Sequence, residues 1–441
     1  MKCDRCGLQS DVEQAFSTQK RLGRPRHFCP DCTLRRQTNS FLADIILLVG
    51  AGILIFSINP NSRAALIVLD VSLIVLFMLP LILMHELAHA GVAKLTGLRV
   101  FGIVIGVGRM IWSGKLFGMQ WTVNSLPIGG ITAVGARPVP GIRAKLFLVY
   151  LAGPASHIVL AYFAHIISRL LPAASFGQRT LGALVFANIL LALFNLFPRK
   201  LSITTGAQGT DGWHLLRVPF LKEHELTKLH VGYFAGEALL AYAENDFDNA
   251  AGWVDQALAL DGNSAVARNV LGIIQMARGE YPASRETFLG LLETEDGREP
   301  ALHYILLNNV AYLNTLMGDP ALLPEADQYS AEALKHLPWV APVIGTRGTV
   351  LVELGQIEEG IALLTKAMSL HPDKQGKALN ACHIALGEFR RGEAAEAHKY
   401  LVTAQTLDPH CVLLPRVKAE LAGSGAPGFP QGGSQTVPVT S

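Results

Sequence analysis

The stretch PLILMHELAHAGVAK at residues 80–94 puts two histidines and a glutamate at the end of a long apolar run. The run starts near residue 65, so it is long enough to cross a bilayer, which takes about 20 residues. Polar side chains inside a membrane span are costly and usually serve a function. The stretch therefore predicts a membrane protein with a polar site inside one of its spans.

Four segments are apolar and long enough to be spans, in a chain of 441 residues of which 50% are hydrophobic. They are residues 41–58, 65–95, 146–171 and 181–197. Lys and Arg concentrate before the first segment and between the second and third, whereas the connection at 59–64 holds only Arg63. The positive-inside rule predicts an integral, multi-pass membrane protein with four crossings and both termini in the cytoplasm. Asp70 then lies at the outer interface, where we expect a solvated side chain.

The segment between the second and third spans does not have a helical pattern. Residues 100–112 and 120–135 are rich in Gly and β-branched residues and have a partial period of two. This pattern predicts short strands. Strand backbone at membrane depth must pair or line a cavity. We therefore expect a membrane-associated β-loop on the cytoplasmic side.

The polar region after residue 218 contains repeated helix-break-helix units. The breaks can be aligned on five anchors spaced 34, 39, 37 and 37 residues apart: Asn245, Gly279, Gly318, Gly355 and Gly392. This period resembles tetratricopeptide repeats, which stack into an α-solenoid and bind a protein or peptide partner. A plain helical bundle is the alternative. We expect Cys382 and Cys411 to be isolated core residues.

His85, Glu86 and His89 have the spacing H-E-x-x-H. Residues four apart share one face of a helix, so both imidazoles can bind one zinc ion. Glu86 can then deprotonate a water molecule whose pKa the metal has lowered. The alternatives are a chance match, expected with a frequency on the order of a few per cent, and histidines satisfied in a packed core. The membrane setting favours the zinc site.

Several motifs together resemble the site-2 protease family of intramembrane zinc metalloproteases. They are H-E-x-x-H in the second span, PIGGITAVG in the β-loop, Gly153-Pro154 in the third span, and Asn195-x-x-Pro followed by Asp211-Gly. The resemblance covers about residues 65–216. It implies that His85, His89 and Asp211 bind the catalytic zinc and that Glu86 is the general base.

The resemblance also implies residues that contact the substrate. Asn195 would bind substrate or steady the oxyanion, and the β-loop would pair with an unwound substrate segment. The other implied substrate-binding residues are Asn124, Gly129, Gly130 and His157. The chain departs from the family pattern in the 16 residues from Asn195 to Asp211, a longer interval than usual, which leaves His214 as an alternative ligand. It also departs in GPASH, where the family has Asn in place of His157; a helix kink with a buried histidine is the alternative reading there.

The first 40 residues contain two C-x-x-C pairs, Cys3 with Cys6 and Cys29 with Cys32. Four thiolates at this spacing predict a structural zinc in a ribbon-like head, with redox chemistry as the alternative. Eight Lys/Arg against four Asp/Glu make this head basic. We interpret this charge as a topology signal that contacts anionic lipid, and we do not expect nucleic acid as a partner.

The predicted fold is mainly α: a polytopic membrane protein with about four spans and a β-loop, a cytoplasmic α-solenoid and a small zinc ribbon with four cysteine ligands. The expected domains are 1–40, 41–218, 219–422 and a disordered tail at 423–441, which is rich in Gly, Pro and Ser. The expected function is zinc-dependent endoproteolysis of transmembrane substrates near the cytoplasmic side, typical of regulated intramembrane proteolysis. The alternative is an inactive membrane scaffold whose repeats bind a partner.

Overall fold

The structure is a computed structural model that describes residues 4, 17–21, 24–28, 30–58, 62–173, 175–200, 209–371 and 373–423. The chain divides into two compact units. One comprises residues 30–267, and the other comprises residues 1–29 with 268–441. The two units are described in turn.

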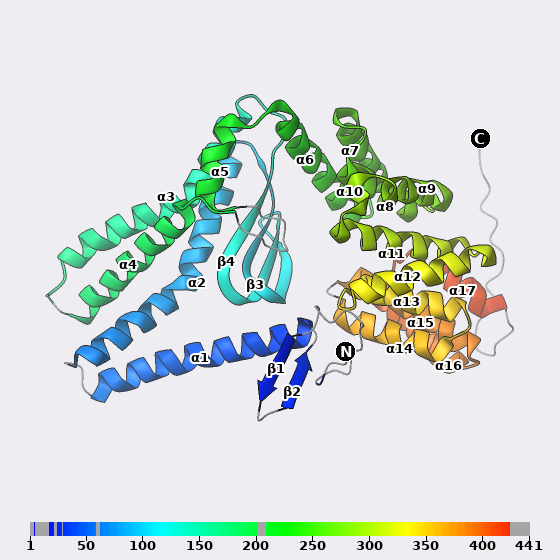
Figure 1. Cartoon of the computed structure of the whole chain (residues 1–441), viewed down its shortest axis with the longest axis horizontal. Helices are drawn as coiled ribbons and strands as arrows, with labels where there is room; N and C mark the ends of the chain where they lie inside the picture. Colours follow the sequence, from blue (N-terminus) through cyan, green and yellow to red (C-terminus); the bar gives the residue numbers. More distant parts are fainter. Residues whose placement is uncertain are drawn as a thin grey trace. The chain divides into compact units, whose positions relative to one another are not determined.

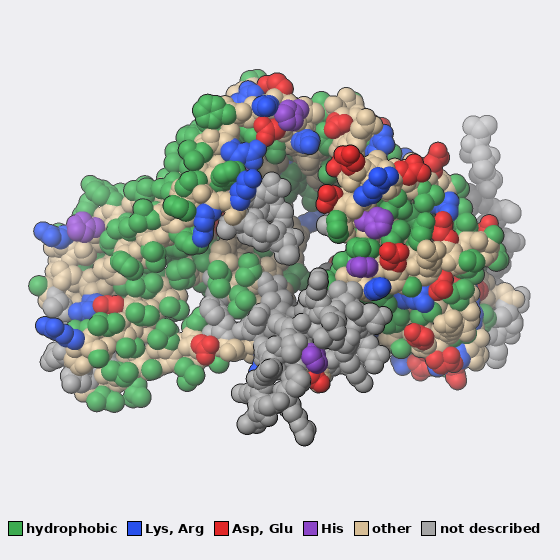
Figure 2. Space-filling view, in the orientation of Figure 1, with side chains coloured by type: hydrophobic (Ala, Val, Ile, Leu, Met, Phe, Trp, Pro, Cys, Tyr) green, Lys and Arg blue, Asp and Glu red, His purple; other side chains and the backbone are tan. Residues whose placement is uncertain are grey.

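The first unit begins with four long helices that are rich in apolar residues (Figure 1). They are α1 (Pro30–Ile58), α2 (Arg63–Leu95), α3 (Ile142–Arg169) and α4 (Phe176–Leu196). A helix satisfies its own backbone hydrogen bonds, which a segment in lipid requires. Many apolar side chains on these helices face outward, including Leu76, Phe163 and Leu193, and hydrophobic atoms cover this part of the surface (Figure 2). These side chains suit contact with lipid.

Among the described residues, three helices are long and apolar enough to cross a membrane: α2, α3 and α4. The second, third and fourth predicted spans lie in these helices. The first predicted span, 41–58, lies in α1, and its crossing remains a prediction.

Asp70 differs from its sequence-based interpretation as a solvated end residue. Its Oδ2 lies 2.8 Å from Nη1 of Arg179 on α4. Both side chains are only partly exposed, at 35% and 27%. Asp70 therefore contributes to helix packing, because a partly buried carboxylate near the end of one helix is paired with a cation on the next.

The β-loop is a long antiparallel hairpin of β3 (Arg99–Leu116) and β4 (Met119–Gly135), which confirms the predicted strands. Residues 102–105 of β3 lie between two parts of β4, because they pair with 130–133 on one side and 120–123 on the other. Residues 112–116 of β3 pair with 119–123. Among the described strands, residues 130–135 therefore pair on one side only and form an edge.

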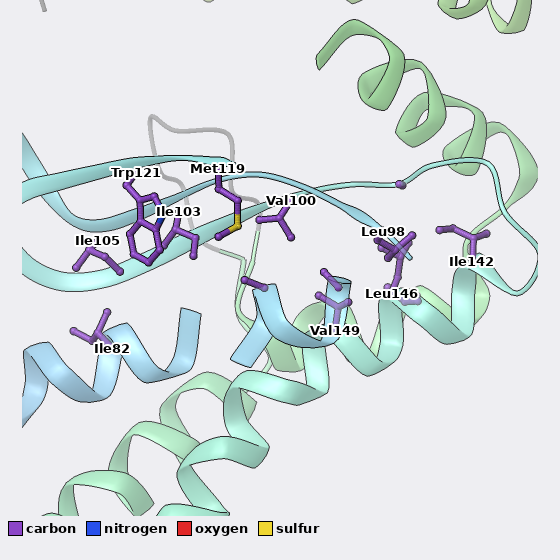
Figure 3. Close-up of a cluster of buried hydrophobic side chains, with 14 of the residues drawn as sticks. Ile82, Leu98, Val100, Ile103, Ile105, Met119, Trp121, Ile142, Leu146 and Val149 are labelled. Atoms are coloured by element: carbon purple, nitrogen blue, oxygen red, sulfur yellow. The ribbon is translucent and has the colours of Figure 1, made fainter. Parts of the chain in front are cut away.

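The hairpin packs on α2 and α3 through one hydrophobic core. Figure 3 shows Ile103 and Trp121 of the hairpin facing Ile82 of α2, with Val149 of α3 in the same cluster. Ile103 is completely buried. This core holds the hairpin beside the H-E-x-x-H turn of α2.

The first unit ends with four further elements: α5 (Asp211–Arg217), η2 (Val218–Phe220), α6 (Glu223–Ala243) and α7 (Phe247–Leu260). The α6–α7 pair is the first of the predicted repeats, and it belongs to the unit that contains the membrane helices. The chain passes to the other unit within α8 (Ala265–Ala277).

The second unit contains the later repeats. Its other helices are α9 (Tyr281–Leu292), α10 (Glu295–Arg298), α11 (Pro300–Met317), η3 (Pro320–Leu322), α12 (Leu323–His336), α13 (Ala341–Glu353), α14 (Ile357–Leu370), α15 (Lys374–Arg390), α16 (Ala394–Leu407) and α17 (Leu414–Gly423). A short hairpin of β1 (Ser17–Arg21) and β2 (Arg24–Phe28) also belongs to this unit.

All five sequence anchors adopt left-handed backbone conformations, from φ 61° at Asn245 to φ 90° at Gly392. Each lies between the two helices of a pair, where a left-handed residue ends the first helix. Fully buried alanines let the paired helices approach closely, among them Ala257, Ala333, Ala367 and Ala404. The tetratricopeptide-like repeat prediction is thereby confirmed.

Two predictions about cysteines have different outcomes. Cys382 and Cys411 are buried as expected, but they are not isolated, because their Sγ atoms lie 3.8 Å apart. In the N-terminal head, Cys3, Cys6 and Cys29 lie outside the described residues, whereas Cys32 is buried in α1. Most of the predicted tail, residues 424–441, also lies outside the described residues.

Candidate metal centre

His85, Glu86 and His89 are all buried, although they belong to an otherwise apolar helix. The helical spacing turns both histidines to one side of α2, where their Nε2 atoms lie 3.0 Å apart. Two ring nitrogens this close need a shared proton or a shared cation between them. The arrangement suits a metal ion bound by both Nε2 atoms.

Asp211 reaches the same point from the start of α5. Its Oδ2 lies 3.0 Å from His85 Nε2, and its Oδ1 lies 3.4 Å from His89 Nε2. Ligand atoms of the three residues all lie within 4.8 Å of one another. Burial would raise the pKa of Asp211, but the two histidines outweigh burial and lower it to about 2. The structure thus brings together the three predicted ligands around an ionised carboxylate.

Thr210 joins the two ends of the long connection between Asn195 and Asp211 by hydrogen bonds. The Thr210 hydroxyl donates to the carbonyl of Phe197 at 2.7 Å and accepts from the Arg199 N–H at 3.2 Å. The same oxygen caps α5 by accepting from the Trp213 N–H. The next glycine, Gly212, is equally constrained, because a Cβ there would lie 1.9 Å from the Leu196 carbonyl oxygen. Residues 201–208 lie outside the described residues, yet these contacts fix where Asp211 begins its helix.

Helix α3 orients His89. His89 Nδ1 lies 2.6 Å from the carbonyl oxygen of Val149, which fixes that nitrogen as the donor and leaves Nε2 free to bind a metal. Gly153 makes this approach sterically possible. A Cβ at Gly153 would lie 2.4 Å from His89 Nε2 and 2.6 Å from His85 Nε2.

Glu86 lies against the edge of the hairpin. Its Oε2 accepts a hydrogen bond from the Thr132 hydroxyl at 2.7 Å. Gly130 leaves room for the carboxylate, because a Cβ there would lie 2.6 Å from Glu86 Oε1. The predicted general base is therefore held beside the edge strand, next to the two histidines.

His157 stacks on His85 with ring centroids 5.1 Å apart. Its Nδ1 lies 2.9 Å from Oδ1 of Asn188, a completely buried residue of α4. Asn188 Nδ2 donates to the Leu184 carbonyl, so its Oδ1 must be the acceptor and His157 Nδ1 the donor. His157 therefore lies at the site in one tautomer, with Nδ1 protonated and Nε2 able to accept a hydrogen bond. This Nε2 stands where the resembled family has an Asn side chain.

The other predicted site residues have contacts of their own. Asn195, in the last turn of α4, donates its amide to the Leu191 carbonyl. Asn124 donates to the Gly106 carbonyl within the hairpin. Gly129 adopts φ 71° at the start of the edge. His214, the alternative ligand, stacks on Tyr150 at 4.4 Å.

Sequence analysis missed three residues that shape the site: Thr132, Asn188 and Thr210. An asparagine within an apolar span is a detectable signal for Asn188. A threonine directly before Asp-Gly is a typical helix N-cap, which could have indicated Thr210. Nothing in the sequence around Thr132 distinguishes it from other strand residues.

The donor set fits zinc. Two imidazole nitrogens and one carboxylate are a common protein ligand set for a catalytic zinc with an open position. His85 Nδ1 and Asp211 Oδ2 are buried without an aligned hydrogen bond. A cation at the point where the three residues meet would satisfy the Asp211 carboxylate oxygens and both Nε2 atoms.

Comparison with known proteins gives the class of this domain. Residues 73–277 match the family model of Peptidase family M50. A protein of Helicobacter pylori strain J99, named "Putative zinc metalloprotease", is 41% identical over 56 residues, which are 13% of this chain and 16% of that protein. Its counterpart in strain 26695 is 39% identical over the same shares. The chain thus aligns with only a small part of these relatives.

Two of the solved structures similar to the chain are TPR proteins. A thermophilic TPR protein of Thermus thermophilus is 20% identical, with a TM-score of 0.35 over 44% of this chain and 98% of that chain. YrrB, a TPR protein described as having an unusual peptide-binding site, is 19% identical, with a TM-score of 0.27 over 42% and 90%.

The apolar helices, the histidine–aspartate cluster and the family match are together the features expected of a membrane zinc metalloprotease domain. Residues 73–277 match the model of Peptidase family M50, and the resemblance stated from the sequence motifs is confirmed at this level.

Proposed function

We propose that this protein is an intramembrane zinc endopeptidase that cleaves transmembrane substrates near the cytoplasmic side of the membrane. One observation carries the proposal: His85, His89 and Asp211 come together from α2 and α5 directly beside Glu86. The family match of the same segment supports it.

The chemistry follows from the positions of these side chains. A zinc ion held by His85, His89 and Asp211 would polarise the scissile carbonyl and lower the pKa of a water molecule. Glu86 accepts the proton of the attacking water and delivers it to the leaving amine nitrogen. Thr132 keeps the Glu86 carboxylate in one orientation by donating to Oε2.

The substrate must be extended at the point of cleavage, because a helix engages its own carbonyl groups. Residues 130–135 of β4 offer a strand edge beside Glu86 that no other described strand pairs with. An unwound substrate segment can add to this edge as a further strand. Gly129, Gly130 and Asn124 then shape the edge, whereas His157 offers a hydrogen-bond acceptor near the scissile bond.

Replacing Glu86 by Gln tests the proposal. The amide has the size of the carboxylate but cannot accept a proton, so cleavage of a transmembrane substrate should fall by at least about 1000-fold. Bound zinc, measured by metal analysis of the purified full chain, should equal that of the wild type. His85→Ala, the matched control, should lose both cleavage and zinc. Wild-type cleavage by the Glu86→Gln variant would contradict the proposal.

We propose the following roles for the remaining parts. Cys3, Cys6, Cys29 and Cys32 bind a structural zinc in the N-terminal head, and both termini are cytoplasmic. The repeats bind a protein or peptide that recruits the substrate, as in regulated intramembrane proteolysis. The N-terminal head, membrane core, repeats and tail divide at about the boundaries expected from the sequence.

An inactive membrane scaffold is the second candidate function. The long connection between Asn195 and Asp211 motivates it, because a displaced Asp211 would leave the zinc site incomplete. Metal analysis separates the two candidates. About two zinc ions per chain fits an active core with a zinc ribbon, whereas about one fits the scaffold.

A further inference from the structure

Helix α6 is the first helix of the repeats by sequence, but one of its faces packs on the hairpin. The residues on this face are His230, Tyr233, Gly236, Glu237 and Glu244. Their spacing follows the helical period, so they lie along a single stripe. The whole stripe and the hairpin belong to one compact unit.

Polar contacts join this stripe to both strands. His230 Nδ1 lies 2.6 Å from the carbonyl oxygen of Ala136, the residue directly after β4. Glu237 Oε1 lies 3.2 Å from Nε of Arg99, the first residue of β3. Arg99 in turn pairs with Gly135 across the hairpin. The stripe therefore contacts the hairpin at the start of β3 and the end of β4, where the edge strand ends.

An apolar contact lies between these two polar ones. The ring of Phe101 from β3 belongs to the hydrophobic core of the α6–α7 pair, together with Val231, Tyr233 and Phe234. Gly236 makes room for this ring, because a Cβ at Gly236 would lie 2.7 Å from Phe101 Cζ. The core of the first repeat is thus completed by a residue of the protease hairpin.

The end of β4 that contacts α6 is only three residues along the strand from Thr132, the hydrogen-bond partner of the proposed catalytic base. Gly135 lies at the α6 contact, and Thr132 on the same strand donates to Glu86. A displacement of α6 would move the edge strand relative to Glu86, because the packed strand cannot stretch between these two points.

We propose that α6 is a positioning element of the protease: it sets the place of the β4 edge against Glu86, and with it the docking of the substrate strand. The inference rests on the proposed proteolytic function and deepens it. By this proposal the first repeat, through α6, takes part in substrate binding by the protease domain.

A pair of glycines on α6 gives a matched test. Gly236→Leu places a side chain against Phe101, whereas a Cβ at the exposed Gly232 meets nothing within 4 Å. Both changes alter helix propensity equally. The full chain in nanodiscs is assayed with a synthetic transmembrane peptide that carries a fluorophore, a quencher and a Gly/Pro-rich segment. Zinc content and amide hydrogen exchange of residues 130–135 are measured in the same preparations.

Gly236→Leu should raise the KM for the peptide at least about tenfold and speed exchange in residues 130–135, with zinc content unchanged. Gly232→Leu should match the wild type in all three measurements. Equal KM and exchange in the two leucine variants would overturn the proposal. If the wild type does not cleave the peptide, the proteolytic function fails, and the exchange measurement alone decides whether α6 positions the edge.

Charge reversal gives a second test that adds no bulk. Glu237→Arg should speed exchange in residues 130–135 and raise KM about threefold, the scale of a partly exposed ion pair. Adding Arg99→Glu should restore both values. A double variant no better than the single variant would overturn the role of this ion pair in positioning.

Discussion

Gly153 illustrates how single residues make the metal centre. Helix α3 passes so close to α2 that any side chain at this position would occupy the space of the histidine Nε2 atoms. The neighbouring Pro154 has no N–H to donate to the Tyr150 carbonyl, one residue after the Val149 carbonyl that accepts from His89. The glycine of the Gly-Pro motif is therefore explained by the approach of two helices.

Gly153→Ala should consequently reduce zinc binding. The added methyl group would lie 2.4 Å from His89 Nε2, so the histidines must move out of their ligand positions. Metal analysis of the full chain should show about one zinc ion fewer per chain than in the wild type. Gly182→Ala is the control, because a Cβ at this glycine of α4 meets nothing within 4 Å. Equal zinc in the two variants would refute the steric explanation.

At the scale of elements, α15 carries a buried histidine whose charge state matters for stability. Burial lowers the pKa of His383 to about 3, and Arg416 and Arg390 act in the same direction. The ring lies 3.2 Å from the Tyr312 hydroxyl of α11. Helix α15 therefore packs best with this histidine neutral.

The sign of the pH dependence follows from this pKa. The unfolded histidine titrates at 6.5 and the folded one at about 3, so the unfolded state binds more protons between these values. The contribution of neutral His383 to the free energy of unfolding is therefore full well above pH 6.5 and is lost as the pH falls from 6.5 towards 3. The loss at pH 5 is about 2 kcal/mol.

Amide exchange of α15 in the full chain at pH 7 and pH 5 measures this loss. His383→Gln should flatten the pH dependence, whereas His410→Gln, at an exposed position, should leave it as in the wild type. An unchanged pH dependence in His383→Gln would contradict the assignment.

At the scale of the whole molecule, the proposed orientation follows from the distribution of basic residues. Lys94 ends α2 near the metal centre, and the following loop is rich in Lys and Arg. Translocating these charges is unfavourable, so this side should remain cytoplasmic. The short connection between α3 and α4 then faces the other side.

Reporter fusions test this orientation. Green fluorescent protein at the C-terminus should fluoresce and alkaline phosphatase there should be inactive, because the C-terminus is expected in the cytoplasm. Phosphatase inserted at residues 171–174 should be active. Phosphatase activity at the C-terminus would contradict the proposed topology.

The sequence by itself predicted the features that depend on local pattern. Apolar length indicated the helices, alternation indicated β3 and β4, and the regular turn residues indicated the repeats, because each is a property of consecutive residues. The spacing of His85 and His89 predicted a shared face of one helix for the same reason.

Tertiary structure alone decided which distant residues meet. Asp211 reaches the histidines because Thr210 closes the long connection, and Thr132 meets Glu86 because the hairpin packs on α2. Asp70 pairs with Arg179, and α6 packs on Phe101 of the hairpin. These contacts join residues far apart in the chain, and they depend on packing between elements, which no pattern within a single element records.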